Sequence, residues 1–144
     1  MRFLLRILPL LAFSFLLVSC GGSKVSKPES STYLFLSQGG GITGKYEGFI
    51  LYEDGRVEVT EGEGQENPKP KGKLPSREAS KIFEAWNVLD VQDKIPFKPG
   101  NMNYKIIYGS GPDLVILDWS DGQKVDTEIQ EFFSETYRKL RNAE

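Results

Sequence analysis

Histidine is absent from this chain of 144 residues, and cysteine occurs once, at position 20. The absence of histidine excludes Ser-His-Asp and Cys-His nucleophile systems and removes the usual proton shuttle near neutral pH. It also excludes zinc sites that combine histidine with several cysteines. Any catalytic chemistry would therefore depend on carboxylates, lysines, hydroxyls and tyrosines.

The chain also lacks an apolar run long enough to span a membrane. A basic start that contains Arg2 and Arg6 precedes an apolar stretch of about twelve residues, short of the ~20 residues that a membrane-spanning helix needs. This pattern predicts a cleaved secretory signal peptide over residues 1–19 rather than a permanent transmembrane anchor.

The four residues that end this segment, Leu-Val-Ser-Cys, resemble the lipobox of bacterial lipoproteins. The resemblance implies cleavage between Ser19 and Cys20, followed by acylation of Cys20 and anchoring to a membrane. Several acyl chains hold a protein stably where a single chain binds marginally. Gly21, which is not aspartate, implies the outer rather than the inner membrane of a two-membrane bacterium, or the outer face of the cell membrane in a single-membrane organism. The alternative is an unmodified cysteine in an apolar run.

Residues 20–31 consist mostly of Gly, Ser, Lys, Pro and Glu, which bury too little apolar surface to fold. We expect a flexible tether there, followed by a single domain over residues 32–144. An acylated Cys20 leaves no thiol for a disulfide, so this domain must be stable through its core alone. Loss of Arg2 and Arg6 with the signal leaves a mildly acidic protein, which has no electrostatic reason to bind nucleic acid.

Apolar periodicity predicts an α+β fold with an antiparallel sheet of about five strands, in the order βββαββα, and two helices packed against it. The expected strands cover residues 32–36, 46–52, 56–60, 103–108 and 114–119, and the expected helices begin at Pro75 or Ser76 and at Asp126 or Thr127. Asp54-Gly55 marks a hairpin turn. The strand at 114–119, apolar on both faces, is a candidate central strand. Residues 61–73 contain no apolar side chain and predict a long exposed loop.

Three glycines after the first strand have the spacing G-x-G-x-x-G of a phosphate-binding loop. That mechanism requires a helix N-terminus directly after the loop, whereas the residues from 45 onward predict a strand. The alternatives are a tight connection that needs glycine, or a loop that contacts a partner. The candidate partner-binding residues are Gly39, Gly40, Gly41, Ile42, Thr43 and Gly44, together with Asn101, Met102 and Asn103 after the Pro99-Gly100 turn.

Other polar and aromatic residues have structural explanations. Asp118, Asp121 and Asp126 do not have the spacing of a calcium loop, and a turn plus a helix cap explains them. Trp86 and Trp119 lie on predicted core faces, so core packing is expected in preference to sugar stacking. We therefore expect neither a metal site nor a cofactor.

Several segments together resemble a set of small uncharacterised bacterial lipoproteins over nearly all of residues 33–140. They are residues 37–44, the Asp54-Gly55 turn, the helix with Ile82 and Phe83, residues 99–104 and the closing helix. The glycine-rich turn, the order of elements and the size are also similar to emfourin, a small proteinaceous inhibitor of thermolysin-type metalloproteases. The lipidation signal and the 61–73 segment are departures from emfourin.

These observations predict a lipid-anchored, non-enzymatic domain of the bacterial cell envelope that binds an envelope or secreted protein, with protease inhibition as one form of that function. An alternative is a structural or assembly accessory that acts through its membrane anchor. A third interpretation is a carboxylate-based hydrolase or sugar-binding enzyme, which would require paired carboxylates in a cleft.

Overall fold

Six strands and two helices form the part of the chain that the computed structural model describes, residues 31–91 and 96–144. The predicted signal peptide, Ser19, Cys20 and most of the predicted tether lie outside the described residues. The elements are β1 (Tyr33–Gly40), β2 (Lys45–Tyr52), β3 (Arg56–Glu61), β4 (Lys69–Lys73), α1 (Ser76–Val88), β5 (Met102–Ser110), β6 (Asp113–Ser120) and α2 (Thr127–Arg141). The predicted α+β class is confirmed.

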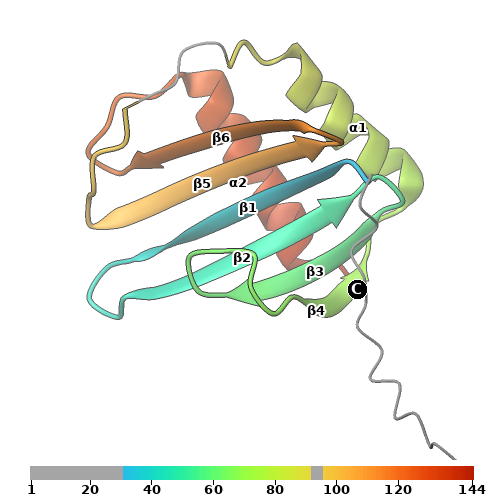
Figure 1. The fold of residues 1–144 in the computed structure, drawn as a ribbon, viewed down its shortest axis with the longest axis horizontal. Helices are drawn as coiled ribbons and strands as arrows, with labels where there is room; N and C mark the ends of the chain where they lie inside the picture. The colour runs from blue at the N-terminus through green and yellow to red at the C-terminus, as the bar shows by residue number, and fades with distance from the viewer. Residues whose placement is uncertain (1–30, 92–95) are drawn as a thin grey trace, which may run out of the picture.

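The strands form one sheet in the order β4-β3-β2-β1-β5-β6, and every neighbouring pair is antiparallel. Both helices lie on one face of this sheet, behind it in the view of Figure 1. The main core is therefore one-sided, between the helices and the strands. Trp86 and Trp119 are both part of it, 3% and 4% exposed, as the sequence predicted.

The prediction of an exposed loop over residues 61–73 was wrong in its second half, where β4 pairs with β3. The strand has the sequence Lys-Pro-Lys-Gly-Lys, which shows no apolar alternation and so gave no strand signal. Proline and lysine are the residues that sheets tolerate at an edge, since proline cannot donate to a ladder and lysine discourages further pairing. This added strand raises the count from about five to six.

The prediction that the 114–119 strand is central was also wrong, because β6 is the edge strand opposite β4. Its residues Leu114 and Ile116 point away from the helices and are 58% and 44% exposed. β1 is buried on both faces, since Leu34, Phe35 and Leu36 have no exposed surface, and so is the second half of β2. An apolar run marks a strand, but it does not by itself rank strands by their position in the sheet.

No helix among the described residues covers the opposite face of the sheet (Figure 1). There the aromatic side chains lie flat over neighbouring strands. The ring of Phe35 covers Gly48 on β2, where any side chain would collide with it. Phe35, Ile50 and Tyr52 thereby form a second, small buried cluster. Glycine in these strands makes room for rings that would otherwise stand in solvent.

Candidate functional site

The two segments predicted to bind a partner meet at one end of the sheet. The turn at residues 41–44 follows β1, and residues 96–101 lead into β5, which is the other neighbour of β1. Gly39 lies opposite Asn103 and Gly40 lies opposite Met102 in the register of these strands. The N–H of Gly41 donates to the carbonyl of Asn101 at 2.5 Å. Antiparallel pairing thus joins two loops that are distant in sequence into one surface.

We call this surface the tip, and define it as residues 40–44 with Asn101 and Met102. The backbone conformation explains why glycine occupies these positions. Gly40, Gly41 and Gly44 have positive φ angles of 114°, 66° and 60°, which residues with a side chain rarely adopt. β2 follows the turn directly, so no helix N-terminus is present to hold a phosphate. The G-x-G-x-x-G spacing therefore belongs to a tight turn.

Two of the predicted residues support the tip rather than forming its surface. Gly39 lies within β1, and the ring of Tyr46 covers it so closely that any side chain would collide. Asn103 uses both ends of its amide, accepting from the N–H of Gly100 at 3.1 Å and donating to the hydroxyl of Tyr46 at 3.0 Å. These contacts position the segment before β5.

Asp121, in the turn after β6, forms hydrogen bonds that hold the tip from a third segment of the chain. Its Oδ1 accepts from the N–H of Asn101 at 3.1 Å, and its own N–H donates to the carbonyl of Met102 at 3.0 Å. The tip is therefore preorganised by hydrogen bonds to its backbone. Ile42 at its apex is fully exposed, and Phe97 nearby in the approach to β5 is 48% exposed.

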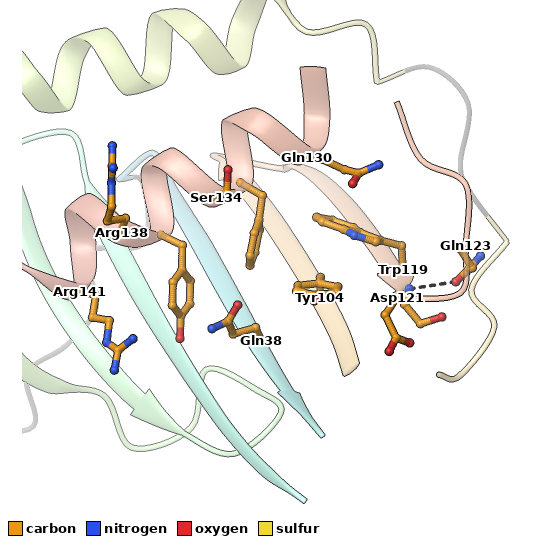
Figure 2. Close-up of a pocket in the computed structure, with 12 residues that line it drawn as sticks. Gln38, Tyr104, Trp119, Asp121, Gln123, Gln130, Ser134, Arg138 and Arg141 are labelled. Atoms are coloured by element: carbon orange, nitrogen blue, oxygen red, sulfur yellow. Dashed lines mark hydrogen bonds between the residues drawn. The ribbon is translucent and has the colours of Figure 1, made fainter. Parts of the chain in front are cut away.

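A groove of about 540 Å³ lies on the helix side of this end of the sheet, between α2 and the ends of β1, β5 and β6 (Figure 2). Aromatic rings form its floor and polar side chains form its rim. The floor residues are Tyr104, Trp119, Phe133 and Tyr137, and the rim residues are Gln38, Ser120, Asp121, Gln123, Gln130, Ser134, Arg138 and Arg141.

The floor is a continuous series of ring contacts. Tyr104 stacks on Trp119 with ring centroids 5.6 Å apart, and Phe133 stacks on Tyr137 at 5.5 Å. Phe133 also meets Trp119 edge to face at 5.3 Å, which connects the two stacks. Such contacts stabilise rings beyond the burial of their area. The floor is therefore a rigid surface that belongs to the core below it.

Tyr137 closes one end of the floor with a charged hydrogen bond. Its hydroxyl donates to Oε2 of Glu47 on β2 at 2.8 Å. Burial of the hydroxyl and this bond to a carboxylate both raise the pKa of Tyr137 well above its usual range. The hydroxyl therefore remains a protonated donor throughout the physiological range of pH.

A second pocket, of about 390 Å³, lies on the helix-free side, at the same end of the sheet. Lys105 and Asp118 line it and form an ion pair at 3.5 Å. Glu63 also lines this pocket, which therefore holds two carboxylates, and that of Asp118 is paired with Lys105.

The three aspartates considered for calcium have separate structural roles. Asp118 pairs with Lys105, Asp121 holds the tip, and Asp126 accepts from the N–H of Glu128 at 2.9 Å as the N-cap of α2. Within residues 31–91 and 96–144, no group of three or more potential metal ligands comes together. In the same residues, no helix has both the length and the apolar character needed to cross a membrane.

Sequence reasoning missed the groove because its residues come from separate strands and one helix. Trp119 was assigned to a predicted core face. That assignment holds, and it does not indicate that the ring borders a cavity. Comparison of the chain with protein-family models gives no match, and comparison with curated protein sequences gives no match either.

Proposed function

We propose that this protein is a lipid-anchored lipoprotein of the bacterial cell envelope, and that its domain binds an envelope or secreted protein through the tip. The anchor is the acylated Cys20, at the outer membrane in a two-membrane organism. Inhibition of a protease is one form that such binding can take. The domain acts in this proposal as a non-enzymatic binding module.

The observation that supports the proposal best is the apolar apex of a preorganised tip. Ile42 is fully exposed, on a turn whose backbone is bonded to Asn101 and, through it, to Asp121. A rigid loop loses little conformational entropy when it binds, so more of the contact energy appears as affinity. A single apolar side chain held at such an apex can insert into a pocket of a partner and dominate the interface.

Site-specific photo-crosslinking in intact cells tests partner binding. A photoreactive amino acid at position 42 is expected to form a discrete adduct with one protein. The matched control is position 88 at the end of α1, where Val88 is also a large exposed apolar residue, 82% exposed, outside the tip. A discrete adduct at 42 and none at 88 supports the proposal. No adduct at 42, or the same adducts at both positions, contradicts it.

Titration against thermolysin-type proteases tests the inhibitor form of the function. Residues 24–144, without the signal and anchor, are expected to reduce protease activity with a stoichiometric end point, and Ile42→Asp is expected to weaken this inhibition. Full protease activity at molar excess of the domain, for several such proteases, would exclude inhibition while leaving other protein partners open to the crosslinking test.

A further inference from the structure

The two edges of the sheet are protected to different degrees. β4 carries Pro70 among lysines, and both residue types discourage further pairing. The N–H of Lys73 also donates to the carbonyl of Glu144 at 3.0 Å, so residue 144 already occupies part of this edge. β6, at the opposite edge, contains no proline and no basic residue. Within the described residues, β6 is therefore the edge that is open to another strand.

The open edge of β6 presents backbone groups and aliphatic side chains at the same residues. The N–H of Asp121 donates to the carbonyl of Met102 on β5 at 3.0 Å, and such bonding repeats at every second residue of an antiparallel pair. Leu114 and Ile116 fall on the alternate positions, so their N–H and C=O groups point away from β5. Their side chains lie on the helix-free face and are 58% and 44% exposed. A strand that paired with β6 would therefore also bury both side chains.

The charges of β6 favour a partner of opposite sign over a second copy of the chain. Asp113 is exposed, and it takes part in none of the ion pairs within the part of the chain that the structure describes. Asp118 is already paired with Lys105. Because β6 itself contains no cation, the pairing of two β6 strands would leave Asp113 without a counter-charge. A basic side chain on a different segment would supply that charge.

We propose that the edge of β6 binds an extended segment of a partner polypeptide, which adds to the sheet as an antiparallel strand. The segment carries aliphatic residues opposite Ile116 and Leu114 and a basic residue opposite Asp113. Its pattern along the chain is therefore aliphatic, any residue, aliphatic, basic. Main-chain hydrogen bonds supply the affinity in this mode of recognition, and alternate side chains supply the specificity. The site is separate from the tip and does not depend on the partner proposed to bind there.

Fluorescence anisotropy of a labelled peptide tests this proposal with the full-length protein in detergent micelles. The probe is Gly-Thr-Ile-Thr-Val-Lys-Gly, in which Ile, Val and Lys lie opposite Ile116, Leu114 and Asp113. We expect saturable binding. A methyl group on the backbone nitrogen of Ile or Val removes a donor that faces β6, and is expected to weaken binding about tenfold. The matched control carries the methyl group on the Thr between them, whose N–H faces solvent, and is expected to bind within about twofold of the probe.

Variants of β6 locate the peptide on the protein. Ile116→Asp is expected to weaken binding about tenfold or more, because a charge replaces an aliphatic contact, whereas Ile116→Val keeps that contact and is expected to bind within about threefold of the wild type. Asp113→Asn is expected to weaken binding of the probe by about twofold to fivefold, and to leave binding of a peptide with Gln in place of Lys unchanged.

Three results would overturn the proposal. The first is equal binding of the peptides methylated at Val and at the central Thr, and the second is unchanged binding to Ile116→Asp. The third is a dimer of the protein without peptide, seen by sedimentation velocity, that Ile116→Asp dissociates, because the edge would then belong to a second copy.

Discussion

At the scale of single residues, the tip depends on backbone positions that only glycine fits. Gly40 has a φ of 114°, and a side chain there would collide with the carbonyl of Asn101. Gly44 has a φ of 60° but faces open space. The two positions therefore separate the cost of a collision from the cost of the dihedral angle alone.

Replacement of these glycines should affect stability to different degrees. Gly44→Ala is expected to cost about 1 kcal/mol, the usual penalty for a left-handed residue. Gly40→Ala is expected to cost about 2–3 kcal/mol, since the strained dihedral is combined with a backbone collision. Denaturant unfolding followed by circular dichroism measures both values. Equal losses would show that β5 moves freely away from Gly40.

The hydroxyl of Tyr137 makes stability depend on alkaline pH. Its pKa is raised in the folded protein by burial and by Glu47, whereas the unfolded chain titrates near the usual value of about 10. Since the folded state holds the proton more tightly, this contribution is complete below about pH 10 and is lost as pH rises above that value.

The expected result is a free energy of unfolding that falls above about pH 10 in the wild type and falls less steeply in Tyr137→Phe. Denaturant titrations at several alkaline pH values measure the slope. Tyr52 has a pKa raised in the same direction, by burial and by its bond to Glu58 at 2.8 Å, so Tyr52→Phe should flatten the remaining slope. Identical slopes in the wild type and both variants would contradict this account.

At the scale of elements, the strand order assigns very different environments to similar apolar residues. Leu34 in β1 is completely buried, whereas Leu114 in β6 is 58% exposed. Leu34→Ala is expected to cost about 3–5 kcal/mol, because truncation leaves a cavity in the core. Leu114→Ala is expected to change the free energy of unfolding by less than about 0.5 kcal/mol. Chemical denaturation of both variants tests the order of the strands, and equal losses would place β6 inside the sheet.

Local sequence patterns predict some of these elements and not others. The Asp54-Gly55 hairpin, the N-cap at Asp126 and the core face of each helix were predicted, because these signals act within a few residues. β4 was not predicted, because Lys69, Pro70 and Lys73 are residue types that occur both at a sheet edge and in a loop. The groove was not predicted for a different reason: it forms only where Tyr104 and Trp119, on two strands, lie beside α2.

At the scale of the whole molecule, the proposed acyl anchor on Cys20 assigns the domain to a membrane surface. Cys20→Ala is expected to abolish incorporation of a fatty-acid label and to release the protein from the membrane fraction, because no acyl chain then contributes its burial in the bilayer. Ser19→Ala is the matched control, since alanine is also small enough for a cleavage site. Membrane fractionation with metabolic labelling measures both. Retention of label by Cys20→Ala would disprove the lipobox.

The sequence alone determined the class of fold, the order of most elements and the residue types available for chemistry, since composition and short-range periodicity encode these directly. It also singled out the residues that meet in the tip, because glycine spacing and turn residues are local signals. Only the tertiary structure decided that β1 is central and β6 an edge, that residues 69–73 pair with β3, and that two arginines share a groove with four rings. Each of these depends on which distant segments become neighbours, and an alternation of apolar side chains specifies the faces of a strand without specifying the strands beside it.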